Sequence, residues 1–229
     1  MAIVKKQQVK VVAINKFIDD VYTIDLQSLS KPFKYEPGQF LHLALDKYDP
    51  SNAWPESRCF SMQSNPSEEN IRITYAVKGD FTKKMAEALH LNTELWIKLP
   101  FGDLFTQQHH VENTVFIAGG TGITPFLSLF TSSSFSAYNN ACLYAGFRNK
   151  ELNLYHDEIA KAKQINPSFQ ANYIYQNEKG IIDIAKILDK SNAGSTFFIS
   201  GPPIMIKQFK KYLLEHGVSE SLVKTDEWE

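Results

Sequence analysis

Apolar and polar residues alternate with a period of two along much of the first hundred residues. Apolar side chains stand at every second position in four runs, at 22–26, 41–45, 71–77 and 95–99. Successive side chains of a β-strand point to opposite faces, so each run predicts a strand with one buried face. Turn residues separate the runs: Pro37-Gly38, Asn65-Pro66 and Pro100-Phe101-Gly102. This pattern predicts an antiparallel barrel or sandwich, interrupted by one helix that Thr82 caps.

The pattern changes beyond residue 114. Strand-like apolar runs at 115–118, 141–145, 171–175 and 196–199 alternate with helical runs near 125–131, 155–164, 182–188 and 204–216. Repeated alternation of strand and helix predicts a parallel sheet with helices on both faces. The polar stretch between Phe105 and Thr114 is the expected linker, so we expect one domain at 1–106 and another at 111–229.

A glycine-rich turn stands near the start of the second domain. Three glycines, Gly119, Gly120 and Gly122, follow the first apolar run of that domain. Thr124 is the expected N-cap of the next helix, and Pro125 suits its first position because no N–H is needed there. Such a turn offers bare N–H groups to an anion, usually a phosphate. Because Pro125 replaces the third glycine of the dinucleotide fingerprint, a tight turn that binds nothing is the alternative.

The segment Arg58-Cys59-Phe60-Ser61 combines three groups suited to a phosphorylated heterocycle. A guanidinium bonds phosphate in a bidentate way, an aromatic ring lies against a flat ligand, and a hydroxyl donates to a ring nitrogen. In a strand, Arg58 and Phe60 point to one side and Ser61 to the other. Alone, the segment equally fits an ordinary barrel strand with a surface arginine.

Composition narrows the class of protein. With 24 basic and 25 acidic residues and a net charge of −1, the 229-residue chain gives no electrostatic case for nucleic acid or a membrane surface. We find no signal peptide and no membrane span, and we expect a cytoplasmic globular protein. Cys59 and Cys142 are far apart, and the histidines lack metal-ligand spacing, so we expect no metal site.

Five motifs occur in a fixed order along the chain. They are Arg58-x-Phe60-Ser61, Lys78-Gly79-x-x-Thr82, Pro100-Phe101-Gly102, the glycine turn 119–125, and Ser200-Gly201-Pro202-Pro203-x-Met205. In this the chain resembles the ferredoxin–NADP(+) reductase superfamily, from about Val9 to Trp228. The resemblance implies an antiparallel flavin-binding β-barrel followed by a Rossmann-like parallel α/β domain that binds a nicotinamide dinucleotide.

The resemblance also implies roles for single residues. In the barrel, Arg58 would hold a flavin phosphate, Phe60 would pack on the flavin, and Ser61 would bond near flavin N5, with Cys59 in the same strand. Lys78, Gly79 and Thr82 would form a second phosphate-binding segment. Two such segments favour FAD over FMN.

Further roles implied by the resemblance fall in the second domain. The residues assigned to the dinucleotide pyrophosphate are Gly120, Thr121, Gly122, Thr124 and Pro125. Gly201 and Pro202 would form the floor of the nicotinamide pocket. The resemblance would place Ser200 beside the reacting carbons, and we expect a catalytic role for it together with Ser61. Asp226 and Trp228 fall where relatives place an acidic residue and an aromatic residue near the flavin.

Three departures from the family pattern bear on function. Many relatives have tyrosine in place of Phe60, and phenylalanine occurs in relatives that treat flavin as a substrate. Many relatives have cysteine in place of Ser200. Nothing in the chain resembles the iron–sulfur domain of oxygenase reductases, so we expect any iron–sulfur partner to be a separate protein.

The choice between NADH and NADPH depends on the segments after the second and third strands of the nucleotide domain. Gln176 and Glu178 could bond a ribose hydroxyl, and Glu178 would repel a 2′-phosphate, whereas Arg148 or Lys179 could bind that phosphate. We expect a preference for NADH.

The resulting hypothesis is an FAD-dependent oxidoreductase that passes hydride from NAD(P)H to FAD and electrons to a separate acceptor, such as an iron–sulfur or flavin protein. Two alternatives are an NAD(P)H:flavin reductase that releases reduced flavin, and a non-catalytic flavin- or nucleotide-binding redox subunit.

Overall fold

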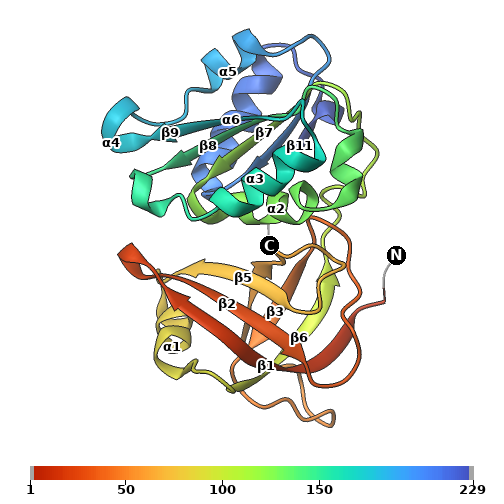
Figure 1. Cartoon of the computed structure of the whole chain (residues 1–229), viewed down its shortest axis with the longest axis vertical. Helices are drawn as coiled ribbons and strands as arrows, with labels where there is room; N and C mark the ends of the chain where they lie inside the picture. Colours follow the sequence, from red (N-terminus) through yellow and green to blue (C-terminus); the bar gives the residue numbers. More distant parts are fainter. Residues whose placement is uncertain (1–2, 227–229) are drawn as a thin grey trace. The chain divides into compact units, whose positions relative to one another are not determined.

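The computed structural model describes residues 3–226, and the chain divides into two compact units (Figure 1). The first unit ends at Asp103 and the second begins at Leu104. The sequence placed the corresponding domain limits at residues 106 and 111. The structural division therefore comes before the polar stretch that was expected to link the domains, and this stretch belongs to the second unit.

The first unit is an antiparallel six-stranded sheet that curls into a nearly closed barrel. Its elements are β1 (Lys5–Lys16), β2 (Val21–Ser28), β3 (Phe40–Ala44), β4 (Ser57–Ser61), β5 (Ile71–Ala76), α1 (Asp80–Ala88) and β6 (Glu94–Phe101). The strand order is β4-β3-β6-β1-β2-β5, so β4 and β5 are its two ends. Just past β4, the N–H of Gln63 donates to the carbonyl of Arg72 on β5 at 2.8 Å, and Ser64 Oγ accepts from the Arg72 N–H. These bonds join the two ends of the sheet.

The long strand β1 is absent from the sequence prediction. Its inward positions alternate as expected at Val9 and Val11, which are fully buried. However, Gln7 shares the inward face, since it pairs with the core residue Ile97, and a register shift follows Val11. A polar residue at an inward position and a bulge interrupt the period of two from which strands are recognised.

The barrel core consists of apolar side chains that each strand points inward. Its fully buried members include Val9, Val11, Ile24, Leu26, Leu41, Leu43, Met62, Ile71, Ile73 and Ile97. Burial of one such side chain stabilises the fold by about 1.5–3 kcal/mol. The helix α1 adds Phe81 and Met85 to this core, and Leu89 follows directly after it, which fixes the helix against the barrel.

The second unit is a parallel five-stranded sheet with helices on both faces (Figure 1). Its elements are β7 (Thr114–Gly119), α2 (Thr124–Phe130), β8 (Cys142–Phe147), α3 (His156–Ile165), β9 (Gln170–Tyr175), α4 (Gln176–Lys179), α5 (Ile184–Lys190), β10 (Thr196–Ser200), α6 (Pro203–Glu215) and β11 (Val223–Thr225). One core cluster holds residues of α2 and α3, and a separate cluster holds residues of α5 and α6. The fold thus agrees with the predicted barrel followed by a Rossmann-like domain.

The strand order of this sheet is β11-β10-β7-β8-β9. It shows where the direction in which successive strands are added reverses. From β7 the chain builds outward through β8 to β9, then returns to the other side of β7 with β10. In open α/β sheets a ligand binds outside the carboxyl ends of the strands where the order reverses. That point lies here between β7 and β10.

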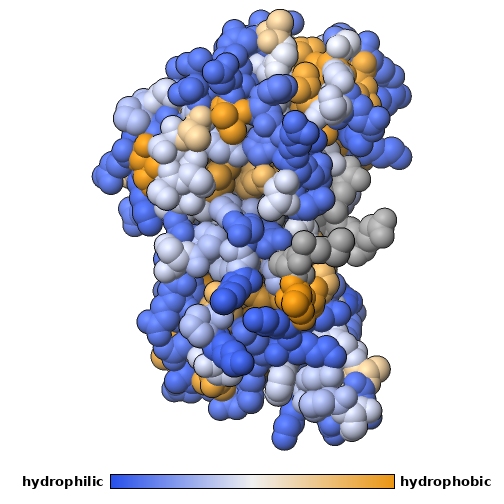
Figure 2. Space-filling model, turned by 90° about the vertical axis from the view of Figure 1, so that its right-hand side faces the viewer, coloured by the Kyte–Doolittle hydropathy of each residue, from blue (hydrophilic) through white to orange (hydrophobic). Residues whose placement is uncertain are grey.

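The surface carries scattered apolar side chains on a mostly hydrophilic background (Figure 2). The most exposed are Ile3, Ile181, Ile204 and Leu91. Within residues 3–226, no helix is long and apolar enough to cross a membrane.

Candidate functional site

Two predicted nicotinamide segments meet at the carboxyl edge of the parallel sheet. The glycine turn follows β7, the loop Ser200-Gly201-Pro202 follows β10, and these strands are direct neighbours in the sheet. The pairing of Ser200 with Ala118 places the two loops side by side. The structure therefore brings together segments 80 residues apart at the reversal point of the strand order.

Glycine is required where these loops touch. A Cβ on Gly122 would lie 2.5 Å from the Gly201 Cα and 2.6 Å from the Ser200 carbonyl oxygen. A Cβ on Gly119 would lie 2.8 Å from Pro202 Cδ and 2.9 Å from Met205 Sδ. Real Cβ atoms do not approach other atoms this closely, so Gly122 allows backbone to pack on backbone, and Gly119 leaves room for the Pro202 and Met205 side chains.

Gly120 is different, because its surroundings are open. It has φ +56°, and nothing lies within 4 Å of a Cβ built there. A positive φ favours glycine, and the open space leaves the backbone accessible to a ligand. This combination fits a phosphate group close to the turn.

The entry into α2 differs from the prediction. Gly120–Ile123 forms a 3₁₀ turn that runs directly into the helix, and Thr124 is already helical with φ −57° and ψ −41°. Its hydroxyl donates to the Thr121 carbonyl at 2.9 Å instead of capping an N–H group. The prediction that Thr124 is the N-cap is therefore wrong, because the 3₁₀ turn already starts the helical backbone before this residue.

Ser200 is buried at the end of β10 and bonded to an acidic side chain. Its hydroxyl donates to Asp226 Oδ2 at 3.1 Å, and the N–H of Asp226 donates to the Ile199 carbonyl at 3.0 Å. The hydroxyl thus holds the carboxylate at the end of the short strand β11, which the sequence did not predict. Trp228, assigned beside the flavin, lies outside the described residues.

Arg148 and the segment after β9 come together at the same carboxyl edge. Arg148 follows β8 directly, and its carbonyl accepts a hydrogen bond from the N–H of Asn177 at 3.2 Å. Gln176 and Glu178 belong to the short helix α4, and both side chains are exposed, as is that of Arg148. The residues expected to choose between NADH and NADPH are therefore neighbours on the surface.

In the barrel, the two predicted flavin-phosphate segments also meet. The guanidinium of Arg58 on β4 lies over the ring of Phe81 in the first turn of α1, with Cζ 5.1 Å from the ring centroid. It also bonds the Glu56 carboxylate at 2.9 Å, and both side chains are about half exposed. An exposed ion pair contributes little stability, so a phosphate can replace Glu56 at low cost.

The start of α1 differs from the prediction as well. The helix begins at Asp80, Gly79 is its N-cap, and Thr82 is the third helical residue. Thr82 Oγ1 accepts hydrogen bonds from the N–H groups of Lys78 at 2.9 Å and Gly79 at 3.1 Å. The prediction that Thr82 is the cap is therefore wrong, because its side chain reaches back to the residues before the helix. Nothing lies within 4 Å of a Cβ built on Gly79, so this backbone too is accessible.

Cys59 and Ser61 alternate with Arg58 along β4 and face the other way. Cys59 Sγ lies 3.6 Å from Nε2 and 3.7 Å from Nδ1 of His42, its partner on β3. Burial raises the pKa of the Cys59 thiol, and burial together with the charge of Lys98 lowers the pKa of His42. Both groups are therefore neutral near pH 7. Ser61 is buried at the end of the strand.

Phe60 points into the barrel core. Its ring lies 6.1 Å from that of Tyr75 on β5, at 64°. Tyr75 in turn stacks on Tyr22 of β2, with ring centroids 5.3 Å apart. Sequence reasoning did not single out Tyr75, and nothing in the strand pattern distinguishes it from an ordinary core residue.

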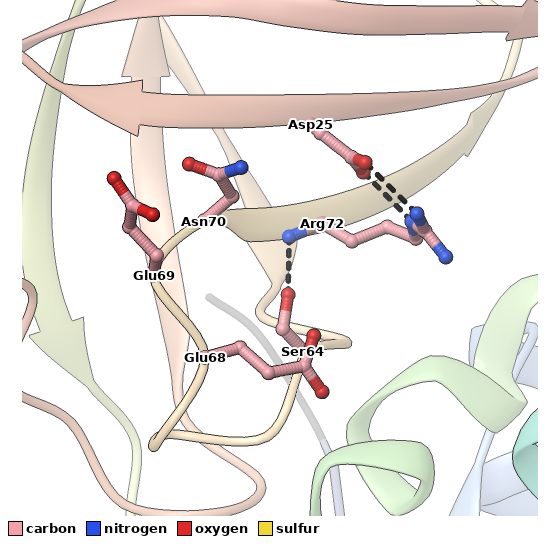
Figure 3. Close-up of a pocket in the computed structure, with 6 residues that line it drawn as sticks. All are labelled: Asp25, Ser64, Glu68, Glu69, Asn70 and Arg72. Carbon is pink, nitrogen blue, oxygen red and sulfur yellow. Dashed lines mark hydrogen bonds and ion pairs between the residues drawn. The ribbon is translucent and has the colours of Figure 1, made fainter.

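A pocket on the outside of the barrel is unsuited to the predicted cofactors (Figure 3). It is lined by Asp25, Ser64, Glu68, Glu69, Asn70 and Arg72. Figure 3 shows the guanidinium of Arg72 turned to the Asp25 carboxylate, with bonds of 2.7 and 2.8 Å. Three carboxylates against one paired guanidinium give this pocket a negative charge, which disfavours a phosphate. Within residues 3–226, no group of three or more possible ligands could hold a metal ion.

Two family profiles match the chain. The FAD-binding domain profile covers residues 3–139, more than half of the sequence, and the oxidoreductase NAD-binding domain profile covers residues 116–211. The chain belongs to the ferredoxin–NADP(+) reductase superfamily. The resemblance seen in the sequence is thus confirmed.

Curated relatives and solved structures of this superfamily are similar to the chain over most of its length. The flavohemoprotein of Rhizobium meliloti (strain 1021) is 23% identical over 82% of the chain and 51% of that protein. The naphthalene 1,2-dioxygenase system ferredoxin–NAD(P)(+) reductase component of Pseudomonas putida is 25% identical over 94% of the chain and 67% of that protein. The chain therefore spans about half to two thirds of the length of these relatives.

Solved structures confirm the fold. A mutant of ferredoxin–NADP+ reductase from Plasmodium falciparum has a TM-score of 0.75 at 18% identity, covering 97% of the chain and 96% of that structure. The flavohem-like FAD/NAD binding domain of nitric oxide dioxygenase from Vibrio cholerae O1 biovar El Tor has a TM-score of 0.77 at 16% identity, covering 96% and 97%.

Proposed function

We propose that this protein is an FAD-dependent NAD(P)H oxidoreductase that passes electrons to a separate acceptor. The observation that carries the proposal is the presence on one chain of an FAD-binding domain and an oxidoreductase NAD-binding domain. Relatives named as reductase components of dioxygenase and monooxygenase systems support an oxygenase-type acceptor.

The residues of each unit fit the groups assigned to them. In the barrel, the half-exposed Arg58 guanidinium and the open backbone at Gly79 suit a flavin phosphate chain. In the parallel sheet, the open Gly120 and the packed Gly122–Gly201 contact make a cradle that any Cβ would fill or distort. A pyrophosphate can approach backbone at this turn, with Gly201 and Pro202 beside it.

The chemistry of the reaction comes from the flavin, which when bound exchanges a hydride for single electrons. The residues of the chain would position the flavin and shield it from water. Arg58 and the first turn of α1 would bind the negatively charged flavin phosphates. The buried Ser61 hydroxyl offers a hydrogen bond at the end of β4. Ser200, the last residue of β10, fixes the carboxylate of Asp226, which follows β11. No thiolate or imidazolium is needed, which agrees with the neutral Cys59 and His42.

Two other functions share these sites. Phe60 in place of the usual tyrosine favours an NAD(P)H:flavin reductase that releases reduced flavin. A non-catalytic redox subunit would use the same binding residues without turnover by the isolated chain.

The visible spectrum of the purified protein tests the proposal. We expect flavin absorption that survives desalting and bleaches when NADH is added, and turnover of NAD(P)H with an artificial one-electron acceptor. Flavin that leaves on desalting, with NAD(P)H oxidation restored by free flavin, would favour the flavin reductase. Bound flavin with no NAD(P)H oxidation would favour the non-catalytic subunit.

We expect a higher kcat/KM for NADH than for NADPH with the same acceptor. The exposed Glu178 in α4 would repel the 2′-phosphate of NADPH, whereas Arg148 would attract it. Steady-state rates of wild type, Arg148→Ala and Glu178→Gln check this. Glu178→Gln should improve the use of NADPH and leave NADH nearly unchanged. A tenfold preference for NADPH that Arg148→Ala abolishes would contradict the expectation.

A further inference from the structure

The hydroxyl of Tyr75 is buried without a hydrogen-bond partner among the described residues. The side chain is only 3% exposed. Nearly all buried hydroxyls in folded proteins are paired with protein or water, because an unpaired one destabilises the fold. A partner for this hydroxyl must therefore come from outside the described part of the chain.

The neighbours of Tyr75 explain why the described residues supply no partner. Its ring stacks on Tyr22 at 5.3 Å and meets the edge of Phe60 at 6.1 Å, within the apolar core of the barrel. Burial, with a smaller effect of Tyr22, raises the pKa of Tyr75 far above the physiological range. The hydroxyl therefore stays protonated and can donate a hydrogen bond to an acceptor such as an oxygen atom.

The position of Tyr75 relates it to the segments assigned to the flavin. Phe60, its ring neighbour, lies on β4 two residues after Arg58 and points the same way. Tyr75 itself lies on β5, three residues before Lys78 and five before the start of α1 at Asp80. Tyr75 therefore lies beside Phe60, the residue expected to pack on the flavin ring. The segment that begins at Lys78, expected to bind a flavin phosphate, follows next in the chain.

We propose that Tyr75 is a flavin-binding residue whose hydroxyl donates to an oxygen of the ribityl phosphate chain. This proposal rests on the proposed function, since it requires a flavin in the barrel. If Phe60 packs on the ring and Arg58 holds the phosphate, the ribityl chain passes between them. The Tyr75 oxygen is shielded from water, so a neighbouring side chain must shift before this oxygen can contact the flavin. We expect Phe60 to shift, because it is the neighbour on the strand that faces the flavin.

The test compares Tyr75→Phe with Tyr22→Phe in the full-length apoprotein. Both changes remove one oxygen from a pair of stacked rings, but the Tyr22 hydroxyl interacts with the exposed Lys16, so it serves as the matched control. Dissociation constants for FAD, FMN and riboflavin are measured by fluorescence quenching. Thermal unfolding of each apoprotein is measured separately.

Tyr75→Phe should weaken FAD binding about three- to tenfold, the usual effect of one neutral hydrogen bond. Its apoprotein should unfold at the same or a higher temperature, because an unpaired buried group is gone. Tyr22→Phe should change neither the dissociation constant for FAD nor the ratio of the dissociation constants for FAD and riboflavin. An equal loss for riboflavin would assign the bond to a ribityl hydroxyl, and a loss for FMN and FAD alone to the phosphate.

Two results would overturn this assignment. An unchanged FAD dissociation constant in Tyr75→Phe would show that the hydroxyl does not touch the flavin. A clear drop in the unfolding temperature of the apoprotein would show that an internal water is the partner. Failure of the proposed function looks different, because wild type would then bind no flavin.

Discussion

Arg58→Ala should weaken FAD binding at least about tenfold, because a charge-assisted bond to phosphate contributes roughly 1.5–3 kcal/mol. The substitution should leave folding nearly intact. The Arg58 side chain is about half exposed both in its pair with Glu56 and where it lies over the buried Phe81 ring. Such exposed contacts stabilise a protein by about 1 kcal/mol or less. Flavin titration of the apoprotein, with circular dichroism for folding, checks the expectation.

Arg72→Ala is the matched control. Arg72 is also a barrel arginine in a salt bridge, with Asp25 at 2.7 Å, but it lines the outer pocket and has no assigned flavin contact. It should leave the FAD dissociation constant nearly unchanged. Riboflavin, which has no phosphate, should bind Arg58→Ala and wild type equally. Unchanged flavin content in Arg58→Ala would remove the phosphate assignment.

The sequence predicted the barrel strands in which apolar and polar residues alternate without interruption. It missed the strand in which this alternation is interrupted. The strands at 22–26, 71–77 and 95–99 appear as β2, β5 and β6 within three residues at each end. The strand β1 was missed because Gln7 points inward and a bulge follows Val11. The three-residue strand β11 is too short for any pattern to reveal.

The helix starts show a second limit of local reasoning. Threonine is a good N-cap, and both Thr82 and Thr124 stand near a helix start. In each case the helical turn begins earlier, at Asp80 and through the 3₁₀ turn from Gly120. The sequence does not specify where the first helical turn begins, and each threonine hydroxyl then bonds to backbone groups three or four residues before it.

The candidate site was predictable in its parts but not in its contacts. The glycine turn and Ser200-Gly201-Pro202 were recognised as motifs in the sequence, because each has an unusual composition. That Gly122 packs on Gly201 depends on the strand order, which places β10 beside β7. The bond from Ser200 to Asp226 and the unpaired hydroxyl of Tyr75 depend on neighbours that are distant in sequence. Such features follow from the fold, and no local pattern encodes them.

Gly122→Ala should have the largest effect on the second unit. The new Cβ would lie 2.5 Å from the Gly201 Cα and 2.6 Å from the Ser200 carbonyl, and these are backbone atoms that cannot turn aside. Overpacking against backbone should destabilise this unit by about 1–3 kcal/mol. Because Gly201 must move, NADH binding should weaken at least about tenfold, while FAD binding by the barrel should persist. Thermal unfolding and NADH titration of the flavin-loaded protein measure both effects.

Gly194→Ala separates the loss of space from the loss of glycine's backbone freedom. Gly194 has φ +79°, but nothing lies within 4 Å of its Cβ position, so alanine should cost only about 1 kcal/mol through the strained backbone. It lies in the turn before β10, at the opposite end of that strand from Gly201, and should leave the NADH dissociation constant unchanged. If Gly122→Ala bound NADH as tightly as Gly194→Ala, the glycine turn would be a packing feature only. The nicotinamide pyrophosphate would then have to bind elsewhere.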